Sequence, residues 1–310
     1  MLMLLTGNGT LFSSCKNKPE KSAAESDTPA TGRIRIVADE SFAPLLRQEI
    51  ITFTDIYKNA AIDAVYLPEL KVTSEFFGHE ENRLMIIARR LMNGEKPYFE
   101  KLGLAPRETK IAIDAIAFVI NKMNPDSQLQ YEQVSDIVNG KITEWRQINP
   151  KSALGSISLV FDNQQSSTVR FLSEKLSIEK LAANAFAVDS NPAVIDYVEQ
   201  NPSAIGVIGS GWISDKDDTT TGKFLEGIQV VAVSAKDNPG IYYLPEKRFI
   251  YSMHYPFLRE LFIISQEKHT GLGTGFATYV ASDEGQRIVQ RVGLMPVDNA
   301  VRVIELKEQF

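Results

Sequence analysis

Short apolar segments with two different periods succeed one another along the chain after residue 32. A strand-like alternation over residues 33–38 is followed by helical spacing over residues 42–57, where Ser41 is a natural N-cap. Two further strands are expected at residues 62–67 and 84–88, and the second is continuously apolar, as in a buried parallel strand. Strands that alternate with helices predict an α/β fold with helices on both faces of the sheet.

A second set of α/β elements follows in the rest of the chain. Helices are expected at residues 131–138, 167–176, 193–200 and 275–292, and strands at residues 156–161, 204–209, 229–233 and 258–265. Between the two sets, residues 111–121 form an apolar run that is too long for one ordinary strand. We expect this run to cross from one lobe of the protein to another.

This order of elements predicts two lobes with a ligand cleft between them. Lobe one is expected to hold residues 33–116 and 246–310, and lobe two residues 117–245. Inserting lobe two into lobe one needs two crossing strands, which we expect near residues 114–120 and 244–252. Strands 33–38 and 156–161 should therefore lie in separate sheets. Two lobes joined in this way can close on a ligand like a hinge.

Composition and charge reduce the number of functions that the chain could have. The chain has 310 residues, of which 44% are hydrophobic and 23% charged, as in a globular protein large enough for two lobes. Its formal net charge of -6 argues against a nucleic-acid partner, which usually calls for a basic face. A negative protein also repels anions at long range, so an anion site must depend on local donors.

The residues that usually carry metal or covalent chemistry are sparse. One Cys cannot form a disulfide framework or a thiolate zinc cluster, and the 3 His are scattered without metal-ligand spacing. We therefore expect no metal and no cofactor. No nucleophile elbow or cysteine–histidine pair is readable, so no residue set requires an enzyme.

The single cysteine is itself informative. Cys15 follows an apolar opening at residues 1–5 and precedes a polar stretch at residues 16–32. This order resembles the lipobox of a bacterial lipoprotein, in which the cysteine thiol is acylated. Residues 1–32 are then a lipoprotein signal and a disordered tether, and the protein is anchored to the membrane in the periplasm or at the cell surface. The alternative is an incidental free cysteine in a disordered terminus.

Two turns that carry hydroxyl side chains follow predicted strands and open predicted helices. The first holds Ser41, and the second, at residues 162–170, holds Ser166, Ser167 and Thr168. Helix N-termini present unpaired N–H groups and the positive end of the helix dipole, so they suit anions. One such turn in each lobe would clamp an anion between them. The alternative for each turn alone is ordinary helix capping.

Two other features are interpreted as structural. Asp114 lies on an apolar strand and is either a hydrogen-bonded structural carboxylate or a hinge contact. The Gly-rich segment at residues 271–275 lacks the spacing of a dinucleotide or phosphate-binding loop, and we interpret it as a flexible entry to a helix.

From about residue 33 to 298 the sequence resembles the substrate-binding protein of the ABC-type phosphate transporter, in the periplasmic-binding-protein-like type II superfamily. The segments that carry the resemblance are residues 41–45, 111–121, 134–145, 203–209, 255–261 and 282–296. The resemblance implies a two-lobed type II fold with two crossing strands. It also implies a monomeric binding protein, not an enzyme, whose partners are a small oxyanion and ABC permease subunits.

Residue by residue, the resemblance assigns a binding site. Ser41 and Phe42 take the position at the first helix, Ser74 takes a second turn, and residues 166–168 take the place of the family's Ser-Gly-Thr. Here Ser167 replaces the Gly of that motif.

The resemblance also has gaps where the family carries charge. Asp162, followed by Asn163, stands where phosphate binders usually carry an Arg, and the usual Asp before the third helix is missing. Asp162 could accept a proton from a protonated oxyanion, which would discriminate phosphate from sulfate.

Some cation must offset Asp162. The candidates are Arg89 and Arg90, at the end of a predicted buried strand, and Arg170 in the second turn. We expect Arg89 or Arg90 to point into the cleft, because ligands of open α/β sheets bind at that edge. The alternative is that both are solvated surface arginines.

The function expected from the sequence is therefore capture of an oxyanion, most simply phosphate, for an ABC transporter. One alternative is a surface sensor or scavenger of another small anion on the same fold. The other is an enzyme on a binding-protein fold, which would need a nucleophile or metal site that the sequence does not show.

Overall fold

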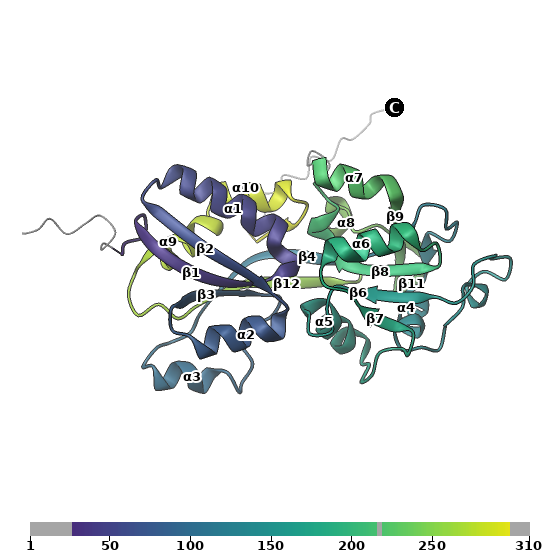
Figure 1. Ribbon diagram of the computed structural model, residues 1–310, viewed down its shortest axis with the longest axis horizontal. Coiled ribbons are helices and arrows are strands. Elements are labelled where there is room, and N and C mark those ends of the chain that lie inside the picture. Colours follow the sequence, from purple (N-terminus) through teal and green to yellow (C-terminus); the bar gives the residue numbers. More distant parts are fainter. Residues whose placement is uncertain (1–26, 216–218, 298–310) are drawn as a thin grey trace, which may run out of the picture.

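The computed structural model describes residues 27–215 and 219–297, so Cys15 and most of the expected tether lie outside the described residues. Figure 1 shows two α/β lobes side by side, linked by β4 (Arg107–Asn121) and β12 (Leu258–Ser265). The two-lobed α/β fold with two linking strands is therefore confirmed. None of the described helices combines the length and apolar character needed to span a membrane.

Lobe one is a sheet covered on both faces by helices. Its strands are β1 (Gly32–Asp39), β2 (Ala60–Leu67), β3 (Asn82–Ile87) and β13 (Met295–Pro296), together with β12 and the first half of β4. Its helices are α1 (Ala43–Ile56), α2 (Glu69–Gly78), α3 (Lys96–Lys101), α9 (Leu272–Val280) and α10 (Asp283–Arg291). Successive β1 residues point to opposite faces, because Ile36 packs in the cluster with Phe53 and Phe276, and Val37 in the cluster with Phe76.

Lobe two repeats this plan with shorter strands. Its main sheet holds the second half of β4 with β6 (Ser158–Phe161), β7 (Ala185–Ala187), β8 (Ala204–Gly209) and β9 (Ile228–Val230). A small sheet holds β5 (Gln128–Leu129), β10 (Ala232–Ala235) and β11 (Asn238–Tyr243). The helices are α4 (Tyr131–Val138), α5 (Ser167–Leu176), α6 (Asn191–Gln200), α7 (Thr219–Gly227) and α8 (Lys247–Tyr251).

The strand β4 belongs to both lobes. Residues up to Ala115 pair with β12, whereas Ile116 to Ile120 pair with β8. Strands β1 and β6 are consequently connected through β4 within one sheet of 10 strands. The expectation of two separate sheets is wrong in that form, because a strand of 15 residues is long enough to serve both lobes.

The return crossing lies later than the sequence suggested. Residues 247–251 form α8, and Ile250, Tyr255 and Phe257 all belong to a core cluster of lobe two. The chain enters lobe one only at Leu258, where β12 begins to pair with Ala115. The predicted crossing at residues 244–252 and the lobe boundary at residue 246 are therefore wrong. The apolar residues after Pro245 fill the core of lobe two instead of bridging the lobes.

Two local expectations also change. The single helix expected at residues 275–292 is two helices, α9 and α10, separated at Ser282, whose hydroxyl donates to the carbonyl of Tyr279. Residues 27–31 are not a free tether, because Asp27 accepts hydrogen bonds from the N–H of Leu272 and from Arg83. Burial raises the pKa of Asp27, but these bonds outweigh it and leave the pKa below its usual value.

The glycines at residues 271–275 make room for this segment. A Cβ on Gly271 would lie 2.7 Å from an Asp27 oxygen, and one on Gly275 would lie 1.9 Å from the carbonyl oxygen of Pro29. The Gly-rich segment therefore allows close backbone approach, in place of the flexible helix entry that its composition suggested.

Candidate functional site

The first serine turn lies where β1 leaves the sheet of lobe one. Asp39 ends the strand, and its Oδ1 accepts the N–H of Ser41 at 2.9 Å. Asp39 therefore caps the short 3₁₀ turn η2 (Glu40–Phe42), and the expectation that Ser41 is the cap is wrong. The Ser41 hydroxyl is buried and has no hydrogen-bond partner among the described residues, so it remains available to a ligand.

The second turn divides its three hydroxyls among three roles. Ser166 caps α5, because its Oγ accepts the N–H of Val169 at 3.3 Å. Ser167 accepts a hydrogen bond from Arg259 Nη1 at 2.8 Å. Thr168 is buried, and its Oγ1 has no hydrogen-bond partner within the described part of the chain. Of the three, Thr168 therefore carries the hydroxyl available to a ligand.

The remaining part of this turn is shaped by Asn163. Its Oδ1 accepts the N–H of Gln165 at 2.9 Å, and its carbonyl accepts the N–H of Ser166 at 3.2 Å. Asn163 is partly exposed, so its side chain holds the turn and lies outside the buried cluster.

The cation of the site is Arg259, on the linking strand β12. It lies opposite Asp114 in the β4–β12 ladder, and its Nε donates to Asp114 Oδ2 at 2.8 Å. Ser210 donates to the other oxygen of Asp114 at 3.0 Å, and the guanidinium lies 4.8 Å from the centre of the Phe42 ring. Arg259 Nη2 is 2.8 Å from Asp114 but is not aligned for a hydrogen bond with any described residue. Its N–H groups can therefore still reach a ligand.

Two buried carboxyls face these donors. Burial raises the pKa of Asp162 to about 7, and the nearby Asp39 adds to the shift. Burial also raises the pKa of Asp39, although Arg259 opposes the shift. Asp162 Oδ1 and Asp39 Oδ2 have no hydrogen-bond partner among the described residues. Near neutral pH the Asp162 carboxyl can therefore either accept a hydrogen bond from a ligand or donate one to it.

An amide on α6 connects the carboxyls of the two lobes. Asn191 donates through Nδ2 to Asp162 at 3.4 Å and also to Glu40 of lobe one. Its Oδ1 accepts the N–H of Gly209 at 3.3 Å. Burial raises the pKa of Glu40, and the hydrogen bonds from Asn191 partly offset that shift.

The result is a buried group of polar atoms where the two lobes meet, which we call the central cluster. Its members with an unpartnered atom are Asp39, Ser41, Asp162, Thr168 and Arg259. Buried polar groups in proteins are almost always hydrogen-bonded, and each exception costs about 1–3 kcal/mol. Several together, contributed by both lobes, indicate a binding site for a small ligand that has both acceptors and a donor.

The arginines expected to supply the cation lie elsewhere. Arg89 pairs with Glu69 at 3.2 Å and Glu95 at 2.7 Å. The side chain of Arg90 is 63% exposed and pairs with Glu108. The structure therefore pairs these two arginines with carboxylates other than Asp162, and the cation of the central cluster is Arg259.

Two further predicted residues also lie outside the central cluster. Arg170 forms an ion pair with Glu69 of lobe one. Ser74 is exposed on α2, while the neighbouring Thr73 turns inward and donates to the carbonyl of Leu70. The central cluster therefore brings together the two serine turns of the sequence prediction and does not include the predicted arginines or Ser74.

Arg259 was missed although the sequence carried a signal for it. In the strand Leu258–Ser265, Arg259 shares a strand face with the apolar Leu261 and Ile263, a pattern that points its side chain inward. A buried charge needs a partner, and Asp114 is a charge in the other long apolar strand. Pairing the two would have located the cation.

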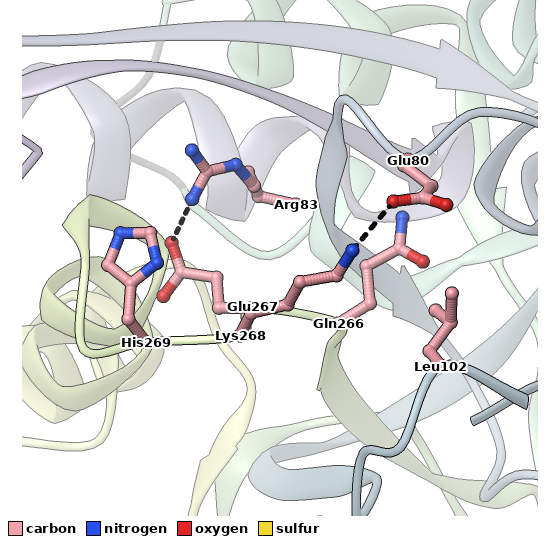
Figure 2. A pocket seen from close by; sticks show the side chains of 7 residues that line it. All are labelled: Glu80, Arg83, Leu102, Gln266, Glu267, Lys268 and His269. Atoms are coloured by element: carbon pink, nitrogen blue, oxygen red, sulfur yellow. Dashed lines mark hydrogen bonds and ion pairs between the residues drawn. The ribbon is translucent and has the colours of Figure 1, made fainter. Parts of the chain in front are cut away.

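A polar cavity at the far end of lobe one offers a contrast (Figure 2). Lys268 pairs there with Glu80 at 3.0 Å, and Arg83 with Glu267 at 3.1 Å. Its cations are thus neutralised by neighbouring carboxylates, and it is a weaker candidate for anion binding. Within residues 27–215 and 219–297, no group of three or more His, Cys, Asp or Glu side chains could hold a metal ion.

Comparisons with known proteins agree with this architecture. The chain is 27% identical over 203 residues to the phosphate-binding protein PstS of Staphylococcus epidermidis, covering 64% of this chain and 59% of that protein. It thus spans less than two thirds of the length of that relative. It is 22% identical over 308 residues to the PstS of Borreliella burgdorferi, covering 96% of this chain and 98% of that protein.

Solved structures show the same fold. A putative phosphate ABC transporter substrate-binding protein from Clostridium perfringens, with bound phosphate, superimposes with a TM-score of 0.72 at 23% identity. The superposition covers 86% of this chain and all of the other. Residues 23–284 match the family described as the PBP superfamily domain. Because that match covers most of the sequence, the chain belongs to the PBP superfamily domain family.

Proposed function

We propose that this protein captures inorganic phosphate outside the cytoplasm and delivers it to an ABC transporter. The observation that carries the proposal is the central cluster, where buried hydroxyl, guanidinium and carboxyl atoms of both lobes have no partner among the described residues. The relatives named phosphate-binding protein PstS give independent support.

The donors of the central cluster match the oxygens of phosphate. Ser41 and Thr168 would each donate a hydroxyl proton, one from each lobe, and Arg259 would add a charged donor. The N-terminus of α5, which begins at Ser167, adds backbone N–H groups and the positive end of the helix dipole. A ligand held from both sides favours lobe closure around it.

The carboxyls explain how such a site could prefer phosphate. Phosphate keeps a proton near neutral pH, and ionised Asp162 or Asp39 would accept a hydrogen bond from it. Above about pH 7, where Asp162 is ionised, sulfate has no proton to offer and would meet an uncompensated buried carboxylate, which is unfavourable. The carboxyl oxygens would in this way disfavour sulfate, while the hydroxyls and Arg259 would bind phosphate.

The setting of the protein is proposed from its sequence. Cys15 would be acylated and hold the protein, as a monomer, at the outer face of the membrane, where it would meet the permease subunits. Replacing Cys15 with Ala should move the protein from the membrane fraction to the soluble fraction of its native cell. Unchanged retention in the membrane fraction would contradict the anchor.

Titration calorimetry tests whether phosphate is the ligand. Phosphate should bind the purified protein with 1:1 stoichiometry, and sulfate should bind at least ~100-fold more weakly, about 2.7 kcal/mol. Binding of another small anion in preference to phosphate would instead support a sensor or scavenger on the same fold. Absence of binding by every oxyanion tried would contradict the proposal.

A further inference from the structure

Beside the central cluster, one carboxylate receives a guanidinium from each lobe. Glu69 opens α2 in lobe one, and its side chain is 5% exposed. Arg170 reaches it from α5 of lobe two and donates to both carboxylate oxygens, through Nε and through Nη2, the latter at 3.0 Å. Arg89 of lobe one donates to the same carboxylate at 3.2 Å. The pair between Glu69 and Arg170 thus spans the two lobes.

Two backbone contacts accompany this ion pair across the lobes. Arg170 Nη2 also donates to the carbonyl of Ala88, at the end of β3, at 3.1 Å. The N–H of Leu70 donates to the carbonyl of Gln165, in the turn before α5, at 3.2 Å. A bidentate ion pair joined by such hydrogen bonds has a defined geometry, unlike a mobile surface pair.

Each partner also has a second partner in its own lobe. Glu69 has Arg89, and Arg170 has Glu174, one helical turn later on α5, at 2.7 Å. If the lobes separate, neither charge is left without a counter-charge. An orphaned buried charge is the main cost of breaking an ion pair, so this arrangement lets the contact break and re-form at low cost.

We propose that Glu69 and Arg170 form a latch that favours the closed arrangement of the lobes before any ligand binds. The latch sets ligand affinity through the population of the closed state, because the apparent Kd is the intrinsic Kd divided by the competent fraction. Its effect on affinity depends on the proposed function, whereas its effect on closure does not.

The substitution Glu69→Gln tests the latch by whether phosphate affinity falls or rises. Glu69 raises the pKa of Asp39, so its negative charge is felt in the central cluster. By long-range electrostatics alone, removing that charge would strengthen anion binding. Loss of the latch should instead weaken phosphate binding by about 10- to 150-fold, the range for a charged hydrogen bond. Arg89 keeps Glu95 and Arg170 keeps Glu174, so the fold should survive.

The matched control is Glu174→Gln. It removes the same charge from the same arginine, but Glu174 lies in lobe two with Arg170 and spans no cleft. Phosphate affinity should stay within about twofold of wild type, as for an exposed pair on one helix. Equal weakening by both substitutions, or tighter binding by Glu69→Gln, would overturn the latch.

Closure can also be measured without ligand. Spin labels on cysteines placed at the exposed Lys101 of lobe one and Lys175 of lobe two, with Cys15 changed to Ser, report the distance between lobes. The protein with Glu69 should show a larger closed population than its Glu69→Gln counterpart. Identical distance distributions would overturn the proposal. If the wild-type protein fails to bind phosphate, the proposed function fails, and this measurement still decides on the latch.

Discussion

Two groups of charged residues lie between the lobes, and they differ in how completely they are paired. Around Glu69, each carboxylate and guanidinium has at least one partner, and several have two. In the central cluster, Asp39, Asp162, Ser41 and Thr168 each keep a buried atom without a partner among the described residues. Fully paired groups hold protein to protein, whereas groups with unused donors and acceptors suit a ligand.

The largest loss of phosphate binding is expected from changing Arg259. This residue is both paired within the protein, with Asp114, and open to a ligand. Changing Arg259 to Met should abolish measurable phosphate binding and also lower the free energy of unfolding by about 3–5 kcal/mol, because Asp114 is left buried and unpaired. Urea unfolding and calorimetry measure the two effects.

A double substitution separates these two roles of Arg259. Adding Asp114→Asn to Arg259→Met should restore most of the lost stability but none of the binding. Recovery of phosphate binding in the double variant would show that Arg259 only supports the fold.

A smaller effect distinguishes two neighbouring hydroxyls of the second turn. Thr168→Val should weaken phosphate binding by roughly tenfold yet leave the ligand-free stability unchanged or slightly higher, since it removes an unpartnered buried hydroxyl. Ser166→Ala should lower stability by about 1 kcal/mol, because Ser166 caps α5. If the Thr168→Val protein were less stable but bound phosphate as tightly as wild type, the Thr168 hydroxyl would bond to the protein and not to the ligand.

The pH dependence of stability compares two buried carboxyls, Asp162 and Glu49, of which only Asp162 lies between the lobes. Burial raises the pKa of Asp162 to about 7 and that of Glu49, inside lobe one, to about 9. The folded state then holds extra protons, so each group lowers stability as the pH rises from its unfolded pKa, near 4, through its folded pKa. Asp162→Asn should remove the loss between about pH 4 and 7, and Glu49→Gln the loss up to about pH 9.

Anion binding should also distinguish Asp162→Asn from Glu49→Gln. Glu49→Gln should leave phosphate affinity unchanged, because Glu49 forms no hydrogen bond with the central cluster among the described residues, whereas Asp162→Asn should reduce discrimination against sulfate. Calorimetry of both anions at one pH checks this. Equal discrimination in Asp162→Asn and wild type would remove Asp162 from the site.

The sequence predicted local elements well where one period dominates. The expected ranges of α4, α5, β8 and β12 agree with the structure, because apolar spacing alone specifies them. The expected helix at 275–292 failed because Ser282 ends one amphipathic helix and begins the next without breaking the apolar pattern. The second crossing failed because apolar residues before β12 look alike whether they fill a core or bridge two lobes.

The central cluster was predicted only in part, for the same physical reason. The serine turns were found because turn and cap signals are local in sequence. Arg259 depends on the register of β12 against β4, which pairs residues 145 positions apart, and no local signal specifies that register. Arg89 and Arg90 were expected at the ligand-binding edge of the sheet, but in the structure Arg89 and Arg170 both engage Glu69.

A crystal structure of the protein grown with phosphate would show whether the central cluster binds the anion. We expect one phosphate between the lobes, with oxygens within about 2.6–3.2 Å of Ser41 Oγ, Thr168 Oγ1 and Arg259, and a carboxyl oxygen of Asp162 or Asp39 facing its proton. We also expect Glu69 to remain paired with Arg170. Phosphate bound elsewhere, or lobes closed with the atoms of the central cluster bonded only to one another, would contradict these expectations.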